Sequence, residues 1–161
     1  MNERIVKAAV AAANKRVPNL PQESGYCLKF VRMVVEWGLF DGRAEFYKRF
    51  LVAGTSGRGG ELTPAQRLAE ARQDPYAADM EASAKALGWA IPSAFRRAGD
   101  LVFDHNAAKP VGHVGVLIGR GMVLEQIHPK FRPTSIHLGH GSLSVTPYAA
   151  RPWTLVARVR E

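Results

Sequence analysis

The sequence predicts an α+β fold in which N-terminal helices pack on one face of a C-terminal antiparallel β-sheet. The first observation is that apolar residues before Ala98 recur at helical spacing, whereas those after Gly99 fall in short β-rich runs. The second is the order, helices first and strands second, which is typical of α+β domains. The third is the length of 161 residues, enough to bury a real core. We therefore expect residues 1–161 to form a single domain.

Two helices are expected near the N-terminus. The first is ended by Pro18 and Pro21, because proline cannot continue a helix. The second starts near Ser24, a suitable N-cap residue, and runs through "CLKFVRMVVEWG". In both segments the apolar residues follow a helical period, so one side of each helix faces the core. The stripe of the first helix contains Ile5, Val6, Ala9, Val10, Ala13 and Val17, and that of the second contains Cys27, Phe30, Val31, Val34 and Val35.

The next segment, residues 39–98, is predicted to be a helical insertion. One piece spans residues 43–52 and runs into "GTSGRGG" (54–60), which lacks the Lys-Ser/Thr ending of a phosphate loop and is interpreted as a flexible connection. "TPAQ" (63–66) is a capping-box pattern. In "DPYAADMEASAKALG" we expect Asp74 to cap a helix that starts at Pro75 and stops at Gly88.

The strands are expected after Gly99. "GDLVFDH" is a short apolar run, and "GHVGVLIGRGMVLEQ" contains two β-rich runs joined by "GRG", which is typical of a hairpin. "SLSVTPY" and "WTLVARVR" supply two further runs. If residues 119–121 form a three-residue loop, Ile118 pairs with Met122 and Gly115 pairs with Glu125.

Cys27 is the only cysteine, and the pattern around it allows two interpretations. Its place on the apolar stripe favours an inert core residue, since buried cysteines are common. Its place in the first helical turn favours a nucleophile, because free N–H groups and the helix dipole stabilise a thiolate there. A nucleophilic thiol also needs a base within hydrogen-bond reach.

The hairpin selects one of five histidines as that base. Alternate residues of a strand and paired residues of neighbouring strands share a face, so His113 and Glu125 are expected to point the same way. A two-residue loop would place Gln126 there instead. The spacing alone equally allows His113 to be a strand-end residue bonded to backbone. The other histidines are His105, His128, His137 and His140.

These residues resemble a known family. "AGDLVF" followed by "GHVGVLIGRGMVLEQ" is similar to the catalytic hairpin of the NlpC/P60 cysteine peptidases, in which a polar third residue lies twelve positions after the histidine; here that residue is Glu125. "SGYCLKFVR" is closer to the related CHAP amidases. The resemblance implies a papain-like fold and cleavage of amide bonds in the peptides of bacterial peptidoglycan. The Asp-Cys-Ser-Gly motif usual in NlpC/P60 enzymes is absent.

The resemblance also implies roles. Cys27 would be the nucleophile, His113 the base, and Glu125 the residue that orients the imidazole. The Cys27 N–H would be one oxyanion donor, and Gln22 and Tyr26 are candidates for another. Gln126, His105 and His128 could line the cleft. No cofactor is required, and no metal is expected because "HLGH" (137–140) lacks the remaining ligands of a zinc site.

Composition limits the partners and the compartment. Lys and Arg number 22 against 14 Asp and Glu, a net charge of +8, which attracts polyanions such as nucleic acid, anionic lipid or anionic wall. The basic residues are scattered, and charge does not choose among these partners; the family resemblance implies peptidoglycan rather than nucleic acid. The sequence has no apolar run that could span a membrane. The N-terminus is an amphipathic helix rather than a signal peptide, so we expect synthesis in the cytoplasm and action on the wall after release by another route.

Three functions are compatible with these observations. The first is a peptidoglycan endopeptidase or amidase, with a phage-type lysin as one form. The second is a papain-like hydrolase of other amides or of lipids, as in an effector or toxin. The third is a catalytically silent wall-binding module, against which the intact Cys27, His113 and Glu125 set argues.

Overall fold

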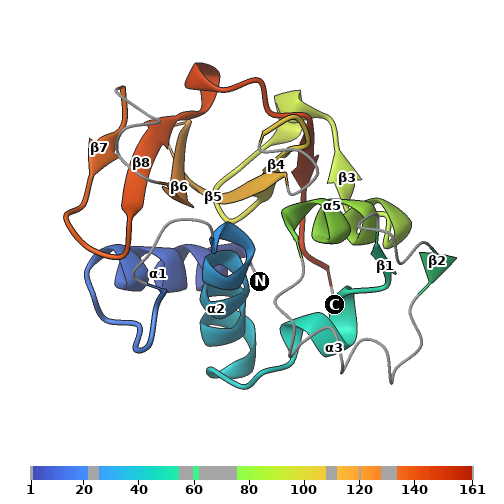
Figure 1. Ribbon diagram of the computed structural model, residues 1–161, viewed down its shortest axis with the longest axis horizontal. Coiled ribbons are helices and arrows are strands. Elements are labelled where there is room, and N and C mark those ends of the chain that lie inside the picture. Colours follow the sequence, from blue (N-terminus) through green and yellow to red (C-terminus); the bar gives the residue numbers. More distant parts are fainter. Residues whose placement is uncertain are drawn as a thin grey trace.

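The computed structural model describes most of the chain. The described residues are 2–21, 26–54, 60–61, 76–107, 112–119, 121–127 and 134–160. Helices precede most strands of the main sheet, as the sequence predicts, but three short strands lie within the described part of residues 39–98, which were predicted to be helical (Figure 1). The elements are α1 (Asn2–Ala13), α2 (Cys27–Phe40), α3 (Phe46–Phe50), β1 (Ala53–Gly54), β2 (Gly60–Glu61), α5 (Ala77–Ala86), β3 (Ala90–Ile91), β4 (Leu101–Asp104), β5 (His113–Gly119), β6 (Met122–Gln126), β7 (Ile136–His137), β8 (Leu143–Pro147) and β9 (Leu155–Ala157), with 3₁₀ turns at Ser93–Phe95 and Tyr148–Ala150.

The main sheet is antiparallel and has seven strands among the described residues. Its order is β3-β9-β4-β5-β6-β8-β7, so the predicted hairpin of β5 and β6 lies near the middle. Strand β3, which lies within the predicted insertion 39–98, joins this sheet at its edge by pairing with β9. The expected α+β class is therefore confirmed.

Helices α1, α2 and α5 cover one face of the sheet (Figure 1). Alternation along the strands decides what each face holds. Val116 of β5 and Leu124 of β6 belong to the large core shared with the helices. Leu117 and Val123 belong to a smaller cluster on the opposite face, together with Trp153. As a result, odd and even positions of the central hairpin enter different environments.

Helix α2 begins at Cys27 itself. Tyr26 occupies the N-cap position without a side-chain capping bond, while the predicted cap, Ser24, lies outside the described residues. The predicted apolar stripe from Cys27 to Val35 is buried throughout. Asp41 ends the helix in the left-handed conformation at φ 52°. Cys27 therefore lies in the first turn and on the core side at once, which are the two features that the sequence indicated.

Helix α1 departs from the prediction in its buried face and in its end. Ala8 and Ala12 are buried, whereas Val10 is 47% exposed. Small side chains let α1 lie close to α2, where a Cβ on Gly38 would meet the Arg4 carbonyl oxygen at 2.9 Å. The helix also ends at Ala13, ahead of both prolines. Close packing of α1 against α2, rather than maximal burial of large apolar side chains, determines which face of α1 is buried.

The hairpin register agrees with the prediction at the site and differs at the tip. Gly115 pairs with Glu125, as expected. Met122, however, pairs with Gly119 instead of Ile118, and the register shifts between Leu117 and Gly119. The irregularity adds one residue to β5, which restores the pairing that a simple two-residue tip would have lost. The side chain at position 125 thus stays on the His113 face.

The region before the sheet agrees with the helical prediction in part. Helix α5 begins after Tyr76, whose backbone N–H donates to the Asp79 carboxylate at 2.9 Å, and Gly88 follows its end at φ +68°. The predicted start, Asp74 and Pro75, lies outside the described residues, as do "TPAQ" and most of "GTSGRGG". Within the part of the chain that the structure describes, no helix has both the length and the apolar character needed to cross a bilayer.

Candidate active site

Cys27, His113 and Glu125 meet where the start of α2 packs against the start of β5. His113 acts on the Cys27 thiol through its charge and as a hydrogen-bonding group, and both lower the pKa of the thiol. His113 Nε2–H donates to Glu125 Oε2 at 2.7 Å. Because Nε2 is engaged by the carboxylate, Nδ1 is the ring nitrogen left for the thiol. The structure therefore brings the three predicted residues into one chain of contacts, while their catalytic roles stay predictions.

The environment of the Cys27 thiol lowers its pKa. Burial by itself raises the pKa, but the charge and hydrogen bond of His113 lower it, and so do backbone N–H groups of Val114 and Leu28. The net shift is downward from the ordinary value of 9.0. The Leu28 N–H is one of the free donors of the first helical turn, which is the contribution expected from a helix start.

His113 is held in the protonated form. Burial opposes its charge, but the Cys27 thiolate and the Glu125 carboxylate together raise the pKa of His113 from 6.5 to about 8. A raised pKa stabilises the folded state, so this contribution is complete below pH 6.5 and is lost as the pH rises through about 8. Each group thus favours the charged form of the other, the thiolate of Cys27 and the imidazolium of His113.

Glu125 is fully buried but well supported. Burial raises its pKa, whereas the hydrogen bond and charge of His113 and the charge of Arg151 lower it, and the net shift is downward. The Thr146 hydroxyl donates to Oε1, and Arg151 Nη2 lies 3.2 Å from Oε2. A buried carboxylate without partners would be costly, so these contacts explain how it stays ionised.

The three residues of the candidate site are all buried, but not to the same extent. Cys27 is 6% exposed and His113 is 8% exposed, whereas Glu125 has no exposure. The Trp153 ring stacks on the imidazole with the ring centres 6.2 Å apart. Cys27 and His113 thus keep a small exposed fraction, whereas Glu125 keeps none.

Low-pH thiol reactivity tests this arrangement directly. Because the pKa of Cys27 is lowered, we expect iodoacetamide to alkylate it at a pH below that at which a free thiol reacts. The measurement is the alkylation rate as a function of pH, followed by mass spectrometry, with glutathione as the reference thiol. His113→Gln should move the profile up toward that of glutathione. A thiol that reacts only after denaturant is added would identify an inert core residue.

Gln126 points away from the candidate site. Neighbouring strand residues face opposite sides, and Gln126 Nε2 donates to the carbonyl oxygens of Pro21 at 2.7 Å and Gly141 at 2.9 Å. Gln126 therefore anchors the segment that precedes α2, and its expected place in the cleft stays a prediction.

Replacing Gln126 should consequently affect stability more than chemistry. Gln126→Ala leaves one buried and one partly buried carbonyl group without this donor and is expected to lower the free energy of unfolding by roughly 1–3 kcal/mol. The measurement is urea denaturation together with turnover, and the loss of turnover should be smaller than for Glu125→Ala.

The remaining candidates lie elsewhere or outside the described residues. Tyr26 precedes Cys27, but its ring is exposed and lies under the Lys29 ammonium group. His105 is near Glu81, with Nδ1 3.5 Å from the carboxylate. Gln22 and His128 fall outside the described residues.

The predicted absence of a metal site is not tested by the structure. His137 Nδ1 lies 2.7 Å from the Ser144 hydroxyl oxygen, and His140 Nε2–H donates to the Ala13 carbonyl at 2.8 Å. Among the described residues, no cluster of three His, Cys, Asp or Glu side chains could hold a metal ion.

Sequence reasoning missed the residues that support Glu125. Thr146, Arg151 and Trp153 come from the last part of the chain, beyond the hairpin that carries the family resemblance. The alternation in "SLSVTPY" places Thr146 on one face of a strand, but only the pairing of β6 with β8 puts that face beside Glu125. Nothing local marked Arg151.

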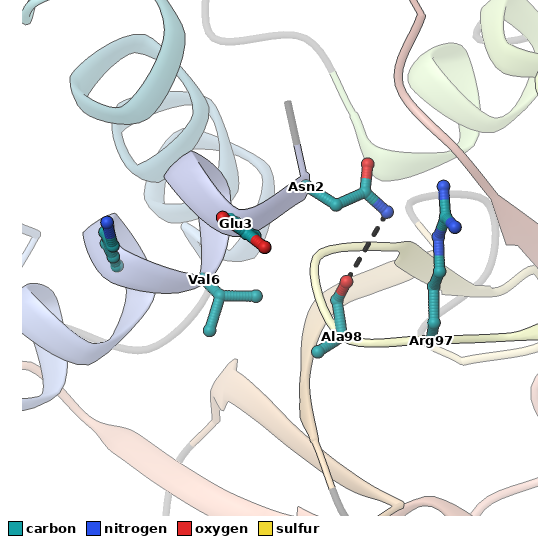
Figure 2. A pocket seen from close by; sticks show the side chains of 6 residues that line it. Asn2, Glu3, Val6, Arg97 and Ala98 are labelled. Carbon is teal, nitrogen blue, oxygen red and sulfur yellow. Dashed lines mark hydrogen bonds between the residues drawn. The ribbon is translucent and has the colours of Figure 1, made fainter.

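A separate cleft of about 630 Å³ lies between the start of α1 and the turn before β4 (Figure 2). Asn2 Nδ2–H donates to the Ala98 carbonyl at 3.4 Å across it. Among the described residues that line it, none is a predicted site residue and none carries a thiol or an imidazole. The lining residues are Asn2, Glu3, Val6, Lys7, Arg97 and Ala98.

Comparisons of the chain with models of protein families, with curated proteins and with solved structures found no match in any of the three. The α+β class and the antiparallel sheet are established by the structure itself. The resemblance to the NlpC/P60 and CHAP families, and the papain-like fold that it implies, stay predictions.

Proposed function

We propose that this chain is a cysteine hydrolase that cleaves amide bonds in the peptides of bacterial peptidoglycan. The observation that carries the proposal is the buried His113–Glu125 hydrogen bond beside Cys27, whose pKa His113 lowers. A nucleophile, a base and an orienting group in this order are what covalent hydrolysis of an amide requires. A papain-like arrangement, with the nucleophile helix packed on the sheet that carries the base, is part of the same proposal.

The residues divide the reaction into two steps. The Cys27 thiolate attacks the amide carbonyl carbon, and the imidazolium of His113 donates its Nδ1 proton to the nitrogen of the leaving amine. The carbon–nitrogen bond breaks, leaving a thioester on Cys27. Water then attacks the thioester while His113 accepts a proton from it, and the peptide departs as a carboxylic acid. Glu125 stabilises the imidazolium throughout.

The helix start supplies a place for the negative oxygen of the tetrahedral intermediate. The Cys27 N–H is the first of α2 and has no carbonyl partner within the helix. It lies beside the nucleophile, as a donor to an oxyanion must. Gln22 and Tyr26 stay candidates for the second donor.

Two features favour the peptidoglycan substrate over other amides. The hairpin and nucleophile segments resemble wall-cleaving families, and the net charge of +8 suits an anionic wall. Action on the wall after release by another route belongs to this proposal.

The test is digestion of purified peptidoglycan sacculi. We expect soluble fragments whose masses report one new amine and one new carboxylic acid for each bond cleaved, and mass spectrometry identifies which bond that is. Cys27→Ser is the matched control and should release none. Binding to sacculi without release would leave only a wall-binding module. Rapid low-pH alkylation of Cys27 without release from sacculi would point to a hydrolase of other amides or of lipids.

A further inference from the structure

Two buried carboxylates flank His113 on neighbouring strands. Asp104 of β4 pairs directly with His113 of β5, and Glu125 lies on β6, on the other side. Asp104 is buried as well, although the imidazole donates to Glu125. Only Glu125 of these two carboxylates hydrogen-bonds the imidazole, so other contacts must hold the two groups in different positions.

Arg151 links the two carboxylates. Its Nη1–H donates to Asp104 Oδ2 at 3.2 Å, and its Nη2 lies 3.2 Å from Glu125 Oε2. The side chain is almost fully buried, and the guanidinium lies 4.9 Å from the centre of the Trp153 ring that also stacks on His113. Such a buried, two-pronged contact is geometrically restrictive, because the guanidinium fork is planar.

We propose that Arg151 is a positioning residue that holds Glu125 as the partner of His113 and limits the basicity of His113 by sharing the charge of that carboxylate. The expected effect of Arg151 on turnover rests on the proposed function. Its expected effect on the protonation of His113 follows from the contacts alone.

The sign of the effect follows from the charges around His113. Among the described residues, Cys27 and Glu125 act on His113 directly, Asp104 is its neighbour on the paired strand, and Arg151 is linked to it through Glu125. Oxygen Oε2 contacts both the imidazole and the guanidinium. Removing the guanidinium takes a positive charge away from Glu125 and Asp104, so the net charge near His113 becomes more negative, and negative charge favours the imidazolium. Removing Asp104 takes one anion away from Arg151. The positive charge of Arg151 then offsets more of the negative charge of Glu125, which disfavours the imidazolium.

The experiment is an NMR titration of His113 in the full chain with ¹³C-labelled histidine. The Cys27→Ala background separates the imidazole from the thiol that titrates with it. Comparison with His113→Gln assigns the signal. Arg151→Met is expected to raise the midpoint by about one pH unit, and Asp104→Asn to lower it. Arg151→Lys keeps the charge and should return the midpoint toward that of the parent.

The matched control is Arg158→Met. Arg158 makes a similar ion pair with buried Asp100, with Nε 2.8 Å from Oδ1, but neither residue touches His113 among the contacts of the described residues. It should lower stability and leave the midpoint unchanged.

Opposite shifts for Arg151→Met and Asp104→Asn support the proposal, and an unchanged midpoint in either folded variant overturns it. If Arg151→Met does not fold, Asp104→Asn and Arg151→Lys still decide the sign. Turnover on sacculi, measured with Cys27 restored, is a separate readout. If the midpoints shift as expected but no fragments are released from sacculi, the role of Arg151 is supported and the proposed substrate is wrong.

Discussion

Cys27→Ser is expected to reduce release of fragments from sacculi by at least about a thousandfold, since the nucleophile of a covalent mechanism is lost. A serine hydroxyl has far too high a pKa for His113 to ionise it as it ionises the thiol. The change is small and the side chain is buried, so the fold should persist. The measurement is the initial rate of fragment release, with circular dichroism to verify that the variant is folded.

A control separates loss of the nucleophile from the cost of a buried hydroxyl. Ala84→Ser places the same group at a fully buried position of α5, away from the candidate site. This variant should lose stability and keep its turnover. Full activity of Cys27→Ser would instead identify Cys27 as a core residue, and the proposed mechanism would then be wrong.

Glu125→Ala is expected to destabilise the fold and lower turnover together. The substitution leaves buried Arg151 without one of its two anions and the Thr146 hydroxyl without its acceptor. Removing one member of a buried ion pair typically costs about 3–5 kcal/mol. Without the carboxylate, the pKa of His113 should fall and the ion pair with Cys27 should weaken. Turnover should drop less than in Cys27→Ser, because nucleophile and base remain.

The pH dependence gives this prediction a second readout. The pKa of Glu125 is lowered in the folded protein, so its contribution to stability is present above the ordinary carboxyl pKa of 4.5 and is lost as the pH falls through the lowered value. Urea denaturation of wild type and Glu125→Gln should therefore differ most near neutral pH and converge in acid.

The comparison with Gln126 tests the register. If Gln126→Ala abolishes turnover while Glu125→Ala leaves it intact, the assignment of the third residue is wrong, even though the structure pairs Gly115 with Glu125.

The local spacing of apolar residues was sufficient to predict the helices and strands around the candidate site. The change from helical spacing to β-rich runs near Gly99 predicted the α+β class, because each element must bury one face and its period records which residues do so. The same logic placed Cys27 at a helix start and His113 and Glu125 on one face of a hairpin. These are short-range properties, and backbone geometry alone enforces them.

The hairpin tip and helix α1 show where local pattern is insufficient. The predicted three-residue loop was wrong, yet it gave the correct partner for Glu125. The turn is shorter, and the irregularity in β5 near Gly119 compensates for it. In α1 the stripe predicted a buried Val10, but close packing against α2 favours alanine at the contact. Both outcomes depend on what a neighbouring element presents, which the period of a single segment does not contain.

The sequence by itself determined the fold class, the element order and the three residues of the candidate site. Only the tertiary structure decided what surrounds them: the support of Glu125 by Thr146 and Arg151, the stacking of Trp153 on His113, and the turning of Gln126 toward Pro21. The physical reason is distance along the chain. These contacts join strands and turns that meet only when the sheet is assembled, and the burial that makes them strong arises at the same moment.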